Sequence, residues 1–357
     1  MPPQTNWTKD VFTVNPIVNN TGRDPSTAWK TPAGEWRLTT FDTMIMGSMD
    51  FRTWYRIGKQ PGFPEGECPS FFPLPRTTPG AGPAPAGAVA PTHVHKASHG
   101  GKDWMQVGSY TAGPPKTNGN WTALLAEVKI DAGHCYASKD FFDPVKGRRI
   151  NFGWATVPPQ STQTLPREVT WHPELQQLVY SPVEEQEALR GSVIGSLQGL
   201  LLTANASTPL DLPAQAGNQS EVQVSFVRPD GAMRLSVHVM VDAQRAPAGV
   251  EFFIDYKPPE TNGLAKVTVG SGSTTDTLSL LPSDSTLELT LFIDNTFTEA
   301  FWMGGRVAMT IVTPASGGKE DVTVRASEPG VTANATAWEV GSIWVTPEEV
   351  KRTPRHD

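Results

Sequence analysis

Short apolar and aromatic runs, separated by turns rich in proline and glycine, fill the first half of the chain. The runs Trp36–Phe41 and Thr43–Ser48 fit two paired strands, and Trp104–Tyr110 with Trp121–Ile130 fits a second hairpin. A further strand is expected at Arg149–Ala155. Strands at this spacing, with turn residues between them, are typical of a β-sandwich or a β-propeller.

The second half shows a clearer alternation of apolar and polar positions, as in Leu287–Leu291 and Leu235–Val239. Alternation with period two predicts strands that bury one face, and a long series of them predicts an antiparallel β-sandwich. The predicted strands are Val222–Val227, Leu235–Val241, Val250–Tyr256, Lys266–Val269, Thr277–Leu281, Leu287–Ile293, Arg306–Val312, Val322–Ala326 and Ala337–Trp344.

One helix is predicted between the two halves, in the segment that begins with the glutamates after Val183 and ends with Arg190. Acidic residues early and a basic residue late complement the helix dipole, and Gly191 is expected to act as the C′ residue. The pattern therefore predicts a first domain, a linker helix and a second domain at residues 1–182, 183–191 and 192–357. The Pro/Ala/Gly-rich stretch 79–91 is expected to be a mobile, peripheral loop.

Composition supports an all-β protein and excludes two kinds of partner. The chain has 357 residues, enough for two domains, and 32 Gly and 33 Pro indicate many turns. The net charge of −7 argues against nucleic acid, because few basic groups are available to neutralise phosphates. No run approaches 18 consecutive apolar residues, so no membrane-spanning helix is predicted, and the N-terminus shows no signal peptide.

The cysteines and the glycosylation sequons bear on the compartment. Cys68 and Cys135 are too few for a disulfide framework, and we expect both to be buried free thiols. The sequons favour a secreted glycoprotein, extracellular or vacuolar, although each is an acceptor only in a secretory pathway. They lie at Asn6, Asn19, Asn120, Asn205, Asn218 and Asn334.

Two short acidic motifs, Arg23-Asp24-Pro25 and Glu67-Cys68-Pro69, are the candidate chemistry. Cleavage of a glycosidic bond with retention needs two carboxyl groups roughly 5–5.5 Å apart. Glu67 is the candidate acid/base, and burial beside Phe71 and Phe72 would raise its pKa. Each tripeptide alone also fits a turn or a surface loop, with Asp24 simply paired to its neighbouring arginine.

Longer runs surround both motifs and follow one another in a characteristic order. They are Arg23–Trp29 (RDPSTAW), Ser48–Trp54 (SMDFRTW), Glu67–Leu74 (ECPSFFPL), Asp131–Lys139 (DAGHCYASK), Arg148–Trp154 (RRINFGW), Leu165–Glu168 (LPRE), Phe292–Asn295 (FIDN) and Gly304–Arg306 (GGR). Through these runs nearly the whole chain resembles glycoside hydrolase family 32, which contains invertases, inulinases, levanases and fructosyltransferases.

The resemblance implies an all-β fold: a five-bladed β-propeller, here partial, followed by a C-terminal β-sandwich. It also implies a retaining glycosidase that acts on β-fructofuranosides, either sucrose or a fructan, without a cofactor. Whether water or a sugar intercepts the intermediate stays open.

The family's site roles map onto residues of this chain. Glu67 would protonate the leaving oxygen, Asp24 would bind fructosyl hydroxyls, and Arg23 would orient both carboxylates and keep Asp24 ionised. Asp131 and His134 would lie on the aglycone side. Among the tryptophans, Trp29 or Trp54 could line a sugar site instead of packing in the core, because flat aromatic faces suit carbohydrate rings.

One family motif is missing. A Trp-x-Asn-Asp-Pro-like run carries the nucleophilic aspartate, and the 22 residues before Arg23 contain no such run. The first blade and most of the second are therefore expected to be absent. The chain is then a fragment or partial gene model, a truncated inactive relative, or a protein that needs a partner piece. The alternative function is that of an inactive relative, either carbohydrate-binding or vestigial.

A cluster of histidines offers a different chemistry. His93 and His95 would share one face of a strand, with His99 close by, and could ligate a metal ion. A polar loop edge explains the same residues, and no cysteine lies near them in the sequence. We therefore predict no metal site.

Overall fold

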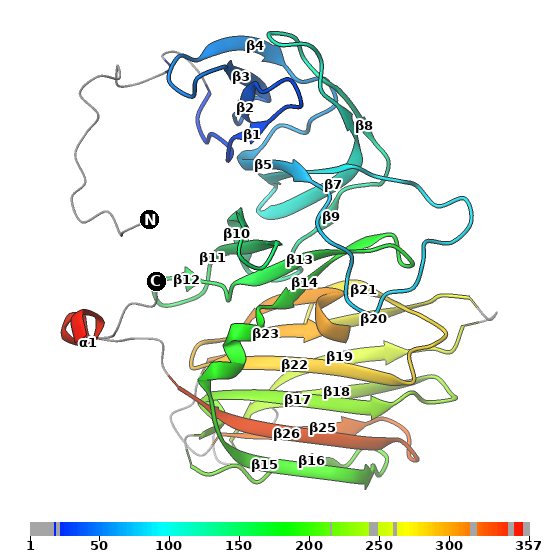
Figure 1. The fold of residues 1–357 in the computed structure, drawn as a ribbon. Helices are drawn as coiled ribbons and strands as arrows, with labels where there is room; N and C mark the ends of the chain where they lie inside the picture. Colours follow the sequence, from blue (N-terminus) through cyan, green and yellow to red (C-terminus); the bar gives the residue numbers. More distant parts are fainter. Residues whose placement is uncertain are drawn as a thin grey trace.

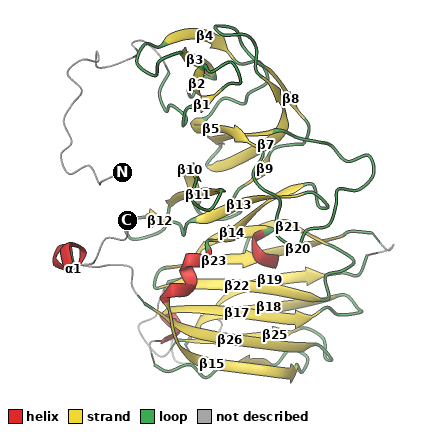
Figure 2. Ribbon diagram, in the orientation of Figure 1, coloured by secondary structure: helices red, strands yellow, loops and turns green. Residues whose placement is uncertain are grey.

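The computed structural model describes residue 18 and residues 22–214, 216–242, 249–259, 263–314, 320–341 and 346–352. The three β-sheets up to residue 182 lie one after another in chain order, and the two larger sheets of the second half lie beyond the third (Figure 1). The described part of the chain is almost entirely strands and loops (Figure 2). This arrangement confirms the predicted all-β class, a partial propeller followed by a sandwich.

The first part consists of three antiparallel sheets of consecutive strands. The first sheet contains β1 (Trp29–Lys30), β2 (Trp36–Thr39), β3 (Met44–Ser48) and β4 (Tyr55–Lys59). The second contains β5 (Glu67–Pro73), β6 (His93–His99), β7 (Lys102–Thr111), β8 (Asn120–Ala123) and β9 (Val128–Lys129). The third contains β10 (Cys135–Asp143), β11 (Arg148–Ala155), β12 (Thr162–Gln163), β13 (Arg167–His172) and β14 (Gln177–Pro182). The strands predicted in this half are present except Trp121–Ile130, which is not one strand: β8 ends at Ala123, β9 covers only Val128–Lys129, and the two pair with separate parts of β7.

The second part is a sandwich of two six-stranded sheets, ordered β15-β26-β17-β22-β23-β24 and β16-β25-β18-β19-β20-β21. The strands of the first sheet are β15 (Arg190–Leu201), β17 (Gln219–Val227), β22 (Thr286–Asp294), β23 (Phe297–Trp302), β24 (Val307–Val312) and β26 (Thr332–Val340). Those of the second are β16 (Ser207–Pro209), β18 (Met233–Val241), β19 (Val250–Tyr256), β20 (Ala265–Ser271), β21 (Thr274–Leu280) and β25 (Asp321–Ala326).

Three strands of the sandwich, β15, β16 and β23, were not predicted. All residues of β23 are buried, so it lacks the alternation that marks a half-exposed strand. The predicted strand Ala337–Trp344 corresponds to the end of β26, and residues 342–345 lie outside the described residues.

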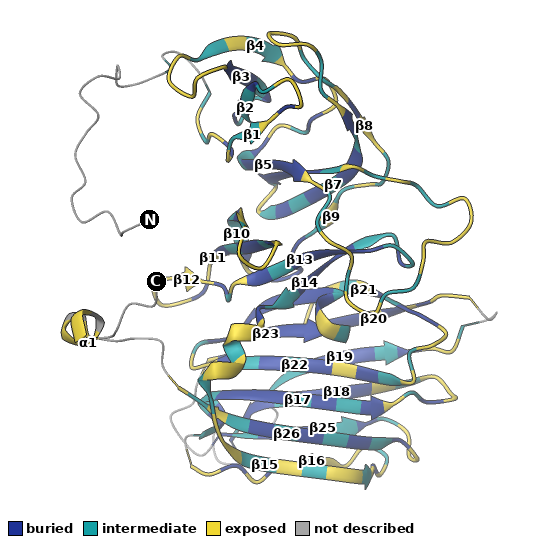
Figure 3. Cartoon of the chain, in the orientation of Figure 1, coloured by how far each residue is buried: buried dark blue, intermediate teal, exposed yellow. Residues whose placement is uncertain are grey.

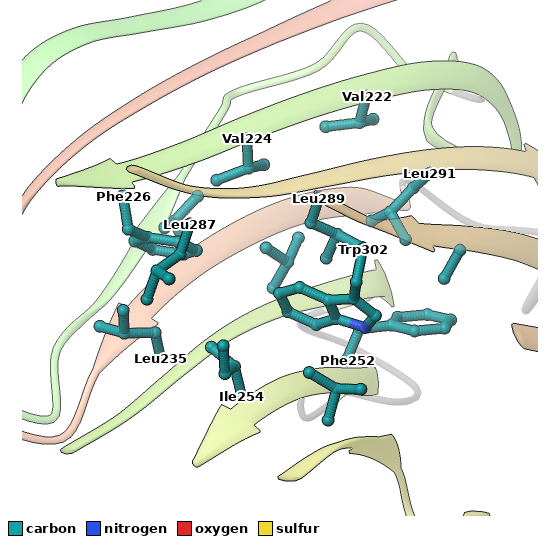
Figure 4. Close-up of a cluster of buried hydrophobic side chains, with 14 of the residues drawn as sticks. Val222, Val224, Phe226, Leu235, Phe252, Ile254, Leu287, Leu289, Leu291 and Trp302 are labelled. Carbon is teal, nitrogen blue, oxygen red and sulfur yellow. The ribbon is translucent and has the colours of Figure 1, made fainter. Parts of the chain in front are cut away.

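Alternating side chains of both sheets fill the sandwich core (Figure 4). On β22, Leu287, Leu289 and Leu291 point inward, where they meet side chains such as Trp302, which is completely buried. The buried strands contrast with exposed loops in Figure 3. The alternation read from the sequence thus decides which face of β22 is apolar.

Separate apolar clusters hold the three smaller sheets together. Phe71 and Phe72 are neighbours on β5, and successive strand residues point to opposite faces. Phe71 therefore packs with Ile45 toward the first sheet, and Phe72 packs with Val169 toward the third. Strand β5 is thereby fixed on both sides.

The predicted linker helix is a short 3₁₀ helix, η1 (Glu184–Leu189), and it does not end at Gly191. Arg190 already has extended backbone and begins β15, where its guanidinium bonds both oxygens of Glu221 at 2.6 and 2.7 Å. Strand pairing with Val340 thus replaces the expected helical C-terminus. Within the described residues the other helices are η2 (Ala216–Asn218), η3 (Met303–Gly305) and α1 (Pro347–Arg352).

A buried ionic network joins the third sheet to the sandwich. The Arg167 guanidinium lies 2.9 Å from Asp131 and 2.6 Å from Glu299, and it donates to the Thr310 hydroxyl at 3.1 Å. Glu299 and Thr310 belong to the sandwich strands β23 and β24. Because the three charged side chains are almost completely buried, the network fixes how the two parts dock.

Candidate active site

The two acidic motifs meet although they come from different sheets. Arg23 Nη2 lies 2.7 Å from Glu67 Oε1, and the backbone N–H of Cys68 donates to Asp24 Oδ2 at 3.3 Å. Arg23 and Asp24 precede β1, whereas Glu67 begins β5. The structure therefore brings Arg23, Asp24 and Glu67 to one place.

Two residues of the third sheet complete this cluster. The Tyr136 hydroxyl donates to Glu67 Oε2 at 2.7 Å. Lys139 Nζ donates to the carbonyls of Pro25 and Pro69 at 3.1 and 3.2 Å, and so connects both motifs. Both residues lie on β10 in the run that carries the resemblance, but no local pattern predicts these contacts. We call Arg23, Asp24, Glu67, Tyr136 and Lys139 the carboxylate cluster.

The backbone at the cluster is unusual in three places. Asp24, Cys68 and Ala137 have φ values of 57°, 47° and 52°, in the left-handed region that few residues other than glycine adopt. The pairing register also shifts between Glu67 and Ser70 and between Tyr136 and Lys139. Such strain and such bulges concentrate at functional sites, where they aim side chains.

The expected raised pKa of Glu67 is wrong. The hydrogen bond from Tyr136, and after it the charge of Arg23, hold the pKa of Glu67 below its ordinary value. The side chain is also about one-third exposed, since Phe71 and Phe72 point into the two sheet interfaces and do not cover it. Burial and the same hydrogen bond raise the pKa of Tyr136 to about 12. Glu67 is thus an ionised hydrogen-bond acceptor at neutral pH.

Asp131 differs most from its expected role on the aglycone side. Its carboxylate accepts bonds from the Gly133 N–H and from both the N–H and the hydroxyl of Thr310, at 2.7 to 2.9 Å, and it pairs with Arg167. Burial raises the pKa of Asp131, but the charge of Arg167 and these hydrogen bonds lower it by more, so that the pKa lies below its ordinary value. A buried carboxylate with these partners offers no surface to a sugar, and its bonds to Thr310 connect it to the sandwich strand β24.

The structure does not bring His134 or Trp54 to the carboxylate cluster by any contact in the described residues. The His134 side chain is exposed, and its backbone bonds Thr310. Trp54 lies in the turn after β3, where its Nε1 donates to the Phe51 carbonyl at 3.3 Å and its ring packs against the Phe51 ring. Trp29 packs on Phe71, with ring centroids 4.8 Å apart.

Two histidines of β6, His93 and His95, are packing residues, whereas His99 is partly exposed with its Nε2 3.4 Å from Glu127. The His93 ring stacks on Phe71 and the His95 ring lies 4.2 Å from that of Phe63. Burial lowers their pKa values to about 4 and about 3, which keeps both rings neutral. Throughout the described ranges, no group of three or more His, Cys, Asp or Glu side chains could hold a metal ion.

Both cysteines are free thiols, as predicted, but only Cys135 is buried. Cys68 is half-buried because its backbone turns through the bulge beside Glu67. Among the described helices, none has the length and apolar character needed to cross a membrane.

Comparison with known families agrees with the motifs. Residues 2–182 match the family model described as "Glycosyl hydrolases family 32 N-terminal domain". The chain belongs to glycoside hydrolase family 32. Family membership accounts for the order of the motifs along the chain.

Several curated relatives of the chain are plant beta-fructofuranosidases. The chain is 31% identical over 255 residues to the insoluble isoenzyme CWINV6 of Arabidopsis thaliana, an alignment that covers 62% of this chain and 46% of that protein. It is 30% identical over 276 residues to insoluble isoenzyme 2 of Oryza sativa subsp. indica, covering 65% and 45%. A vacuolar acid beta-fructofuranosidase of Arabidopsis thaliana is 29% identical over 237 residues, covering 57% and 34%. The chain thus spans less than half the length of these relatives.

Solved structures of family 32 share the fold. Fructan 1-exohydrolase IIa from Cichorium intybus superposes with a TM-score of 0.74 at 23% identity, covering 92% of this chain and 74% of that one. Exo-inulinase from Aspergillus awamori gives a TM-score of 0.65 at 16% identity, covering 92% and 71%.

Proposed function

We propose that this chain carries part of the active site of a retaining glycoside hydrolase that acts on β-fructofuranosides, with sucrose or a fructan as substrate. The observation that carries the proposal is the carboxylate cluster, in which Arg23 binds Glu67 and Asp24 accepts a bond from the residue after Glu67. Two carboxylates brought together in this way, Glu67 by Arg23 and Asp24 by the Cys68 backbone, suit a glycosidase, because both must reach the same sugar.

Each carboxylate of the cluster has a proposed role. Glu67 is the acid/base: it protonates the leaving oxygen and then activates the incoming water. Asp24 binds fructosyl hydroxyls and stabilises the positively charged transition state. Tyr136 and Arg23 orient Glu67, and their contacts favour its ionised form, so that its action as an acid needs a substrate that changes those contacts.

The nucleophile is not assigned to any residue, because the chain contains no Trp-x-Asn-Asp-Pro-like run. The 357-residue chain alone should therefore show no appreciable turnover of sucrose or inulin, since no covalent fructosyl intermediate can form. Robust hydrolysis by the purified chain would show that another carboxylate is the nucleophile and would refute this mechanism.

The decisive experiment joins the chain to an upstream family segment that carries the Asn-Asp-Pro run. The extended protein should hydrolyse sucrose or inulin, and Glu67→Gln in it should lower kcat by about 10²–10⁴-fold, the usual contribution of general acid–base catalysis. Glu65→Gln is the matched control, because Glu65 is exposed and pairs with Lys59 at 2.8 Å. Equal losses in both variants would contradict the role of Glu67.

A second candidate function is carbohydrate binding without turnover. The lowered pKa of Glu67 favours it, because an ionised carboxylate is a poor proton donor but a good acceptor for sugar hydroxyls. Binding of sucrose or a fructan to the chain, with no activity after extension, would support this function. One plant relative, from Zea mays, is a cell wall isozyme by name and one from Arabidopsis thaliana is vacuolar, and we propose an extracellular or vacuolar location here.

A further inference from the structure

Lys96 places a positive charge directly beneath the carboxylate cluster. It lies on β6, the neighbour of β5, and its side chain is completely buried. Its Nζ donates to the Ser98 hydroxyl and the Ser138 carbonyl, both at 2.7 Å, and to the Cys68 carbonyl at 3.2 Å. Asp103, from β7, supplies the fourth oxygen at 3.2 Å. The ammonium is thus surrounded by oxygen atoms from four different strands.

Two of these oxygens belong to the bulges that carry the cluster. Cys68 follows Glu67 in the bulge of β5, and Ser138 lies two residues after Tyr136 in the bulge of β10. The Asp103 carboxylate strengthens the second attachment, because its Oδ2 also accepts the Ser138 N–H at 2.7 Å. The Lys96–Asp103 pair therefore clamps both bulges to the same point.

Packing alone does not account for this arrangement. Burying an ion pair costs more solvation than an apolar pair of similar volume, and such a pair is weak evidence for stability. Other nearby positions of the same sheet, such as Met105 and Val94, are apolar and fully buried. What an ammonium provides and a methionine cannot is simultaneous bonding to two carbonyls that point away from regular pairing.

We propose that Lys96 is a positioning residue for the Glu67–Tyr136 pair, holding the two strand bulges at the separation at which the Tyr136 hydroxyl reaches the Glu67 carboxylate. The catalytic meaning of this positioning rests on the proposed function, but the positioning itself does not. Without Lys96 the Cys68 and Ser138 carbonyls lose their shared donor. The left-handed backbone conformations at Cys68 and Ala137 are then no longer stabilised by the bonds from Lys96.

The test is the titration of Tyr136 in the full chain, followed by NMR of ¹³Cζ-labelled tyrosine. The chain has 5 tyrosines, and Tyr136→Phe identifies the signal. In the unmodified protein the pKa of Tyr136 is about 12. In Lys96→Met it should fall below about 12, because burial still raises the pKa but the phenol loses its carboxylate partner. An unchanged value would overturn the proposal.

Two further variants make the result specific. Lys102→Met is the matched control, since Lys102 also donates to two backbone carbonyls, those of Ala132 and Gly133, and it should leave Tyr136 at about 12. If Lys96→Met does not fold, Lys96→Met with Asp103→Asn removes both buried charges and keeps an acceptor for Ser138. The same fall is expected there, and its absence would equally overturn the proposal.

Failure of the positioning role is distinguishable from failure of the proposed function. If Tyr136 shifts as expected but the chain binds no fructoside and the extended protein hydrolyses none, Lys96 has its positioning role and the proposed function is wrong. If the chain binds a fructoside and Tyr136 does not shift in either variant, the site stands and Lys96 does not position it.

Discussion

Removing the Arg167 guanidinium should destabilise the protein more than most single substitutions can. Arg167 is buried between Asp131 and Glu299, at 2.9 and 2.6 Å, and the Thr310 hydroxyl is a further partner. In Arg167→Met these two carboxylates stay buried without their shared cation. Breaking a buried pair in this way costs about 3–5 kcal/mol, because an uncompensated charge is left in a medium of low polarity.

Burial already raises the pKa of Glu299, so the variant should respond by taking up a proton there. The free energy of unfolding is measured by urea titration at pH 7, with tryptophan fluorescence as the signal. Arg234→Met is the control, because Arg234 pairs with Asp255 at 2.7 Å on the exposed face of β18. Exposed pairs contribute about 0.2–1 kcal/mol.

Restoring neutrality should recover much of the loss. In Arg167→Met combined with Asp131→Asn and Glu299→Gln, no uncompensated charge is buried, so the triple variant should be more stable than Arg167→Met alone. If Arg167→Met lowers the free energy of unfolding by less than about 1 kcal/mol, as Arg234→Met does, the network does not hold the third sheet against the sandwich.

Three other predictions follow from single contacts. Trp302→Ala should lower the free energy of unfolding by about 3–5 kcal/mol, because the ring is fully buried in the sandwich core, and a urea titration showing under about 1 kcal/mol would contradict this. Tyr136→Phe should raise the pKa of Glu67 toward its ordinary value, measured by ¹³C NMR of the carboxyl group, and an unchanged value would mean that the hydroxyl does not bond it. The pKa of Glu185 is lowered to about 2, chiefly by its bonds from Arg148, so this stabilisation is present above pH 4.5 and is lost as the pH falls through about 2. Glu185→Gln should therefore have a lower melting temperature than the unmodified protein at pH 6. The difference in melting temperature should shrink below pH 4.5, and a difference that does not change with pH would contradict this prediction.

Much of the fold was predictable because local pattern and buried face agree. On β22 the alternation of Leu287, Leu289 and Leu291 with polar residues identifies the core face directly. Strand β23 was not predicted, because both of its faces are buried and its sequence shows no alternation of apolar and polar residues. The extended start of β15 also escaped, because pairing of Arg190 with Val340 is a contact between distant parts of the chain.

The candidate site was predictable in its motifs and not in its electrostatics. The motifs place Asp24 and Glu67 in one family pattern, and the structure brings them together. The pKa direction of Glu67 depends on Tyr136, which is distant in sequence and reaches it only through the stacking of two sheets. The burial of Asp131 depends likewise on Arg167 and on a sandwich strand. Neither partner is visible from local sequence.

Whether the carboxylate cluster is the sugar site is best measured by the binding of a fructoside to the chain. The ¹⁵N-labelled chain is titrated with sucrose and with a short fructan while the amide signals are followed by NMR. Saturable shifts of the Cys68 and Ala137 amides are expected, and they should be abolished in Asp24→Asn and preserved in Glu65→Gln. Shifts confined to other regions, or shifts at Cys68 that survive Asp24→Asn unchanged, would contradict the assignment of this cluster as the sugar site.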